Sequence, residues 1–143
     1  MNNHENQVRL EIDARSENVS LARVVATAFV TPFDPTVGEL SDIKTAVSEA
    51  VTNAIIHGYG ENSGTVTILL TSHGRKISIE ISDVGIGIEN IENAREPLFT
   101  TKPEMERSGL GFTVMESFMD EVIVTSTPGA GTTIIMTKTL GAQ

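Results

Sequence analysis

The spacing of the strand-forming runs is the feature that most limits how this 143-residue chain can fold. Two β-rich runs, at residues 65–72 and 76–82, are separated only by a short turn that contains glycine. Two more, at residues 122–127 and 132–139, flank a second glycine-rich turn. A parallel crossover needs a dozen or more residues, so each pair is predicted to be an antiparallel hairpin. A doubly wound parallel sheet is therefore disfavoured.

A strand and a helix are predicted before these hairpins. Apolar and polar residues alternate over residues 8–14, which is the period of a half-buried strand. Ser16 is expected to cap a helix over residues 17–30, and Pro32 and Pro35 end that helix.

A long second helix is predicted next. Thr36 and Glu39 have the spacing of a capping box, and apolar residues recur at helical spacing from there to Ala54. Gly58 is expected to stop the helix.

The region before the last hairpin has weaker signals. Residues 90–94 are expected to form a short helix, and residues 110–118 another behind Gly109. Residues 96–108 are polar, contain two prolines and show no sustained period, so we expect a loop there that acts as a lid.

The order of these elements predicts one domain over residues 1–143 with an α/β fold. We expect a two-layer sandwich, in which a mixed, mostly antiparallel sheet has its helices packed on one face.

Charge and composition exclude several classes of protein. The net charge is −9 and the sequence pI is about 4.7, which is the wrong sign for binding nucleic acid through its phosphates. The chain has no cysteine, no signal-peptide pattern and no apolar run of membrane-spanning length. We therefore expect a cytoplasmic protein without a nucleic-acid or membrane partner, whose acidic surface suits a basic protein partner.

Glu49 and Asn53 are the first pair of residues that could carry chemistry. They are four positions apart in the predicted long helix and so project from nearly the same face. A solvated helix edge is the commoner explanation for such a pair. The functional alternative is that Asn53 offers an amide oxygen to Mg²⁺, while Glu49 accepts a hydrogen bond from a nucleophilic hydroxyl or water.

Two glycine-containing segments could bind a ligand. Asp83 follows a predicted strand and precedes Gly85 and Gly87, so its carboxylate could accept from an exocyclic amine while the glycines admit a flat ring. Gly109 and Gly111 lie at the beginning of a predicted helix, whose first backbone N–H groups favour an anion. Considered alone, these segments are equally well explained as an Asp-x-Gly turn and a hinge.

Basic residues are few and unevenly placed. Lys102 and Arg107, with Arg95 before them, are three of only ten cations, which favours phosphate contact in the expected lid. Arg23 interrupts an apolar stretch of the first helix and is a candidate contact for protein partners, although a solvated arginine is the commoner case. The three histidines are dispersed and do not suggest a metal cage.

Taken in order, four motifs resemble those of the ATPase and kinase superfamily that includes gyrase, histidine kinases and MutL. They are the Glu49 to Asn53 run, the Asp83 to Gly87 run, Gly109-Leu110-Gly111 and Gly131-Thr132. Each is weak alone, but their order and the lid-like loop are specific. The short length is similar to the branch of anti-sigma factors that are also serine kinases.

The resemblance implies a Bergerat-type fold that binds ATP or ADP with Mg²⁺. It implies that Asn53 holds Mg²⁺, that Glu49 is the catalytic base, and that Asp83 binds the adenine amino group with help from Thr132 or Thr133. The remaining implied pocket and lid contacts are Gly85, Gly87, Lys102, Arg107, Gly109 and Gly111.

The implied activity is capture of a sporulation sigma factor by a nucleotide-bound homodimer, and phosphorylation of an anti-anti-sigma protein on serine. A phosphoryl transfer of this kind depends mainly on positioning and charge neutralisation. Two alternatives stay open: a nucleotide-dependent binding module, and an ATPase without protein kinase activity.

Overall fold

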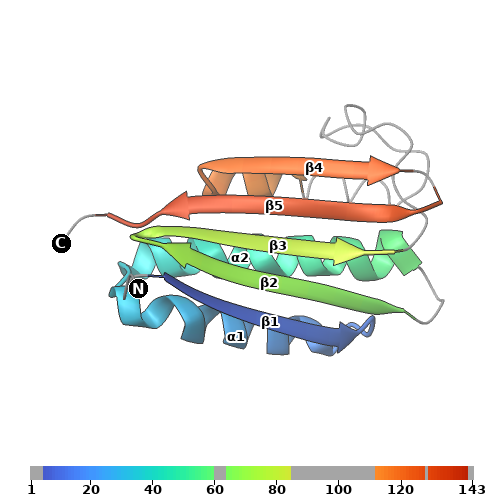
Figure 1. The fold of residues 1–143 in the computed structure, drawn as a ribbon, viewed down its shortest axis with the longest axis horizontal. Helices are drawn as coiled ribbons and strands as arrows, with labels where there is room; N and C mark the ends of the chain where they lie inside the picture. The colour runs from blue at the N-terminus through green and yellow to red at the C-terminus, as the bar shows by residue number, and fades with distance from the viewer. Residues whose placement is uncertain (1–4, 60–63, 85–111, 128, 142–143) are drawn as a thin grey trace.

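The computed structural model describes residues 5–59, 64–84, 112–127 and 129–141. Its described strands form one five-stranded sheet in the order β1-β2-β3-β5-β4, and every neighbouring pair is antiparallel. Helices α1 and α2 lie behind the sheet in Figure 1, on one face of it. The elements are β1 Glu5–Asp13, α1 Asn18–Val30, η1 Thr31–Phe33, α2 Val37–Asn53, η2 Ala54–Tyr59, β2 Thr65–His73, β3 Lys76–Asp83, β4 Glu121–Thr127 and β5 Gly131–Thr139.

The predicted two-layer α/β sandwich is confirmed, with a sheet that is antiparallel at each described pairing. Both predicted hairpins are present. In the first, His73 pairs with Lys76, and Gly74 in the turn has a φ of 61°, a left-handed conformation that glycine adopts without steric cost.

The predicted capping box begins α2. The Glu39 backbone N–H donates to the Thr36 hydroxyl at 3.0 Å, and the Thr36 N–H donates to the Glu39 carboxylate at 2.9 Å. Two backbone donors that a helix start leaves without partners are satisfied in this way.

The predicted start of the first helix is wrong. Helix α1 begins at Asn18, its N-cap is Glu17, and no side chain caps it. Backbone hydrogen bonds from Asn18 to Arg15 and from Val19 to Ser16 make the connection a tight turn. Ser16 lies within this turn, so its hydroxyl is not the cap.

The expected bounds of two other elements also change. Strand β1 begins at Glu5 rather than at residue 8, because its polar first residues pair with the end of β2, where Glu5 lies opposite His73. Helix α2 ends at Asn53, and Gly58 does not stop it, since the chain continues through Gly58 as the π-helical segment η2. A π-helical turn often marks a functional site.

The packing of the core follows from the two-residue repeat of the strands and the 3.6-residue repeat of the helices. Alternate residues of β3 and β5 face the helices, as do every third and fourth residue of α2. The fully buried large side chains include Ile43, Ile68, Leu70, Ile77, Ile79, Ile81, Phe112, Met115 and Met136.

Some expectations lie outside the described residues. They are the short helix at 90–94, the loop at 96–108 and the beginning of the helix at 110–118, which the structure describes as helical from 112 to 118. None of the helices within the described ranges has the length and apolar character needed to span a membrane.

Candidate nucleotide site

Asp83 is the last residue of β3 and continues the buried row of that strand. Ile77, Ile79 and Ile81 precede it on the same face and are at most 1% exposed. Asp83 itself is only 7% exposed. A carboxyl group thus takes the place where the alternation would put another aliphatic side chain, at the end of the sheet where β5 begins (right in Figure 1).

Thr132 lies directly beside Asp83. The two residues are paired across β3 and β5, and Thr132 is also buried, at 8% exposed. Thr133 pairs with Ser82 on the other face of the sheet and is half-buried. Of the two threonines that the sequence offered, Thr132 is therefore the one that adjoins Asp83.

Ser126 is a polar neighbour that sequence reasoning did not identify. Its hydroxyl lies 2.9 Å from the Thr132 hydroxyl and donates to the Gly131 carbonyl oxygen at 3.1 Å. The contact depends on the β4–β5 register, in which Ser126 faces Thr132. A serine in a strand of threonines and valines gives no local signal for this pairing.

Gly131 allows β5 to start against Asp83. Its φ is 111°, and a Cβ atom there would overlap the Asp83 carbonyl oxygen and lie 2.7 Å from the Val84 Cα. No side chain fits at this position without moving the backbone of the site. The glycine of the Gly131-Thr132 motif is thus required by close packing.

Asn53 is the last residue of α2 and is 7% exposed, which excludes the solvated edge as its environment. It follows Ala46 and Ala50 at spacings of four and three, the pattern of the buried stripe, so the sequence held a signal for its burial. The side-chain nitrogen Nδ2 of Asn53 is fully enclosed. Segment η2, which follows Asn53, packs against β3 and β5.

Glu49 lies one turn before Asn53 on α2. It is half-buried and lines a groove of about 460 Å³ between α1 and α2, together with Arg23, Ser41, Lys44, Thr45 and Ser48. Glu49 thus lies at the groove that contains Arg23, and Asn53, one turn further along nearly the same face, is buried. A hydroxyl entering this groove would meet the carboxylate of Glu49.

The other predicted site residues lie outside the described residues. They are Gly85, Gly87, Lys102, Arg107, Gly109 and Gly111, with the expected lid.

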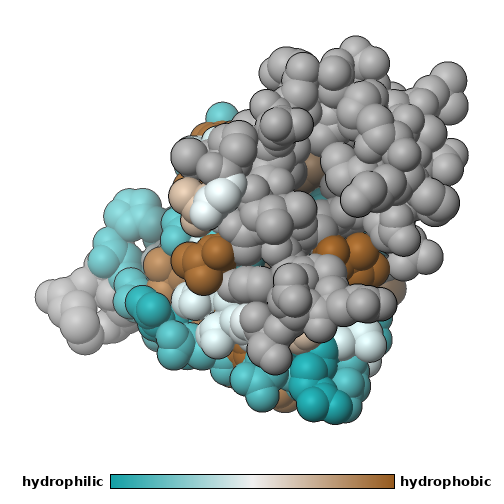
Figure 2. Space-filling view, turned by 90° about the vertical axis from the view of Figure 1, so that its right-hand side faces the viewer, coloured by the Kyte–Doolittle hydropathy of each residue, from teal (hydrophilic) through white to brown (hydrophobic). Residues whose placement is uncertain are grey.

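Figure 2 looks onto the end of the sheet that carries Asp83 and the start of β5. The lower part of this end, where β1 ends and α1 begins, is hydrophilic.

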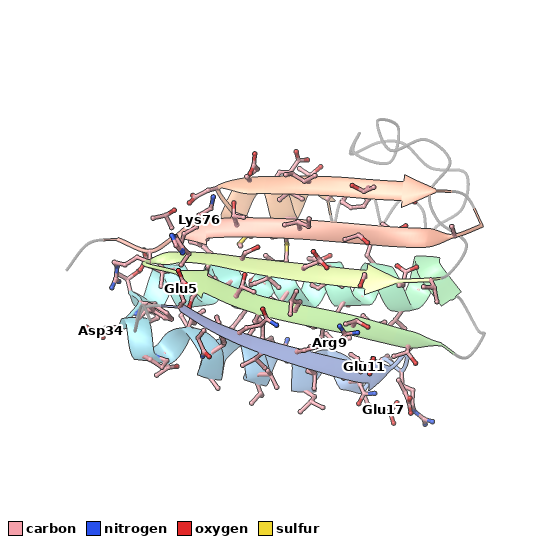
Figure 3. The ribbon with its side chains drawn as sticks, viewed as in Figure 1. Glu5, Arg9, Glu11, Glu17, Asp34 and Lys76 are labelled. Carbon is pink, nitrogen blue, oxygen red and sulfur yellow. The ribbon has the colours of Figure 1, made fainter. Side chains whose placement is uncertain are left out.

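Hydrogen bonds lower the pKa of Glu17 and of Glu39. A hydrogen bond from Arg15 lowers the pKa of Glu17, and the backbone N–H groups of Thr36 and Gly141 lower the pKa of Glu39. Figure 3 shows Glu17 at the start of α1, below the end of β1.

The polar side chains at this end of the sheet suit an adenine nucleotide with Mg²⁺. The carboxylate of Asp83 can only accept hydrogen bonds when ionised, and it would therefore select an amino group over a carbonyl on a bound base. Asn53 carries a neutral amide oxygen, which is a ligand type that Mg²⁺ takes.

Comparison with known protein families agrees with this chemistry. The family described as "Histidine kinase-like ATPase domain" matches residues 12–138. The chain therefore belongs to the histidine kinase-like ATPase family.

Curated relatives narrow the family further. The chain is 58% identical to the anti-sigma F factor of Clostridium acetobutylicum over 134 residues, which are 94% of each chain. It is 56% identical to the anti-sigma F factor of Bacillus subtilis, over 94% of this chain and 93% of that one. Within the ATPase family, the chain is thus a member of the anti-sigma F factors.

Solved structures share the fold at low identity. The RsbU and RsbW domains of a Mycobacterium tuberculosis protein match with a TM-score of 0.66 at 19% identity, over 94% of this chain and 32% of that one. The catalytic domain of the histidine kinase ThkA matches with a TM-score of 0.57 at 18% identity, over 93% of this chain and 96% of that one.

Proposed function

We propose that this chain is an ATP-dependent anti-sigma factor that binds and inhibits a sporulation sigma factor and phosphorylates an anti-anti-sigma protein on serine. It acts as one domain over residues 1–143, as a homodimer, in the cytoplasm where a sigma factor works. No direct contact with nucleic acid or membrane is required. Its membership in the anti-sigma F factors supports the sigma factor as partner.

One structural observation carries the nucleotide part of the proposal. Asp83 and Thr132 are buried side by side where two rows of aliphatic residues end. The apolar alternation of both strands would by itself place aliphatic side chains at these two positions, so a buried carboxyl group and a buried hydroxyl there depart from the local pattern in the way that functional sites do. We assign Asp83 to the adenine amino group and Thr132 to an adjacent contact, with Thr133 the weaker candidate.

The phosphates belong at the end of α2. Asn53 would hold Mg²⁺, which neutralises charge on the phosphates. Glu49 would orient the acceptor serine: its carboxylate accepts the hydroxyl proton as the serine oxygen bonds to the γ-phosphorus and the bond to the ADP oxygen breaks. The groove beside Glu49 offers the serine an approach.

The remaining proposed nucleotide contacts come from residues that lie outside the described structure. Gly85 and Gly87 would admit the base, and Gly109 and Gly111 would allow closure of a lid over residues 96–108. Lys102 and Arg107 would meet the phosphates. ATP must contact this lid differently from ADP if nucleotide state is to control partner binding.

Arg23 is the candidate for capture of protein partners. It is half-buried in the groove, and among the described residues it takes part in no ion pair. Replacing Arg23 with glutamate should weaken capture of the sigma factor or of the acceptor without changing Mg-ATP affinity. Unchanged capture of both partners would remove Arg23 from the proposal.

Incubation with ATP labelled on the γ-phosphate separates the proposal from its two alternatives. A serine kinase transfers the label to the anti-anti-sigma protein. A nucleotide-dependent binding module leaves ATP intact, and an ATPase releases free phosphate. Absence of label on the acceptor protein would contradict the kinase proposal.

Two variants test the division of roles on α2. Glu49→Gln should cut the single-turnover transfer rate while Mg-ATP affinity stays the same, because a group that orients the nucleophile does not hold the nucleotide. Asn53→Ala should weaken Mg-ATP binding itself. A wild-type transfer rate in Glu49→Gln would rule out its assigned role.

A further inference from the structure

The side chain of Arg23 is held by two serine hydroxyls from two helices. Its Nη1 donates to the Ser48 Oγ on α2 at 3.3 Å, and its Nη2 donates to the Ser20 Oγ on α1 at 3.4 Å. The Ser48 contact is part-buried, and the Ser20 contact is exposed. Ser48 thus ties the arginine of one helix to the neighbouring helix.

The direction of these hydrogen bonds is fixed by the donors available. A hydroxyl has one proton, and Ser48 donates it to the Lys44 carbonyl oxygen at 2.9 Å. Arginine can only donate, so the Ser48 oxygen must accept from Arg23. Ser48 therefore donates to Lys44 and accepts from Arg23 at the same time. The guanidinium of Arg23 is restrained on the side that faces α2.

The restrained guanidinium keeps binding capacity. It has five N–H donors, and the serines use two of them. Arg23 and Lys44 both line the groove, and no ion pair to either is present in the described part of the chain. Arg23 and Lys44 outweigh the single carboxylate of Glu49 in the groove, so its net charge is positive, and the remaining donors of Arg23 suit a carboxylate of a protein partner.

We propose that Ser48 is a positioning residue that holds Arg23 in its binding conformation for a partner carboxylate. The inference rests on the proposed role of Arg23 in partner capture. A side chain that is already ordered loses less conformational entropy when it binds. Because Ser48 immediately precedes Glu49, the same turn of α2 would orient both the partner-binding arginine and the proposed catalytic carboxylate.

The test is the affinity for the cognate sigma F factor, measured by calorimetry with Mg-ATP present. Ser48→Ala should weaken this affinity about three- to tenfold, the cost of ordering one free side chain. Ser48→Thr retains the accepting oxygen and should restore binding to within about twofold of wild type. Ser20→Ala should have a smaller effect than Ser48→Ala, since its contact is longer and exposed.

Ser117→Ala is the matched control. Ser117 also donates to the carbonyl oxygen four residues earlier at 2.9 Å, but it is exposed and makes no described contact with Arg23. It reproduces the local effect of removing a helix serine, so its sigma affinity should equal that of the wild type. Thermal unfolding of each variant confirms that it is folded.

A double-mutant cycle with Arg23→Ala isolates the positioning effect. If Ser48 acts through Arg23, Ser48→Ala has no further effect in the Arg23→Ala background. An equal loss in both backgrounds, or wild-type affinity in Ser48→Ala, overturns the inference while the proposed function stands. Wild-type affinity in Arg23→Ala overturns the role of Arg23 and with it that of Ser48. A wild-type chain that binds no sigma factor overturns the proposed function as well.

Discussion

The two ends of α2 use polar residues in opposite ways. At its first turn, Glu39 accepts from the backbone N–H groups of both Thr36 and Gly141, which fastens the chain after β5 to the helix. Nearby, Lys138 pairs with Asp42 at 3.4 Å and donates to the Phe118 carbonyl oxygen. These contacts join segments that lie far apart in the sequence.

At the other end of α2, polar residues replace members of the core. Asn53 occupies the buried stripe of the helix, and Asp83 and Thr132 end the buried rows of two strands. Figure 3 labels Asp34 and Lys76 at the fastened end, far from the end where β3 finishes. The difference indicates that one end of the molecule serves stability, while the other departs from local rules as functional sites do.

Changing Asp83 should have the largest effect on binding. Asp83→Ala should reduce Mg-ATP affinity at least about tenfold, equivalent to about 1.4 kcal/mol, because it removes the proposed acceptor for the adenine amine. Ser82→Ala, one residue earlier on the opposite face, should change affinity less than about twofold. Calorimetry gives both values, and equal affinities would contradict the assignment.

A substitution at Gly131 tests whether the end of the sheet that carries Asp83 and Thr132 depends on close backbone packing. Gly131→Ala forces a Cβ atom against Asp83, whereas Gly129→Ala at a φ of 81° meets no atom within 4 Å. The loss of unfolding free energy should be larger for Gly131→Ala by at least about 1 kcal/mol. Urea denaturation measures the difference, and equal losses would mean that backbone strain alone matters.

A substitution at Thr36 tests the end of the molecule at the first turn of α2, where Glu39 joins the chain after β5 to the helix. Thr36→Ala removes the hydroxyl of the capping box and should cost about 1 kcal/mol of stability, a fall of about 2–4 °C in melting temperature. Mg-ATP affinity should stay within about twofold of wild type, since this end lies apart from the proposed site. A parallel loss of affinity would remove the distinction between the two ends.

Glu39 gives the smallest effect and a pH dependence. Its pKa is lowered from an ordinary 4.5 by the two N–H donors, so the folded chain favours the ionised form. The unfolded chain binds the proton more readily, so this stabilisation is present above about pH 4.5 and is lost as the pH falls through the lowered value. Relative to Glu39→Gln, wild type should be more stable at pH 7, and the gap should shrink on acidification. An equal difference in melting temperature between wild type and Glu39→Gln at every pH would contradict this.

Much of the fold was predictable because its signals are local. The hairpin spacings, the alternation in the strands and the capping box at Thr36 each depend on a few neighbouring residues. Segment η2 was not predictable, because helical periodicity does not distinguish an α-helix from a π-helical turn over six residues. The cap at Ser16 failed because the turn after β1 is set by backbone hydrogen bonds.

The candidate site was predictable in its residue types and less so in its geometry. Sequence order indicated Asp83 and Thr132, but only the strand register brings them together and separates Thr133. The contact of Arg23 with Ser48 depends on how α1 and α2 pack. Such contacts join residues far apart in the chain, which a single sequence does not encode locally.

An NMR titration with Mg-ATP tests the central claim, that the nucleotide binds at the end of α2 formed by Asn53, Asp83 and Thr132. The account predicts large amide shift changes at residues 49–56, 81–84 and 131–133. Amides at residues 36–42 and 138–141 should be nearly unchanged. Changes centred on the first turn of α2, or no saturable change anywhere, would contradict the account.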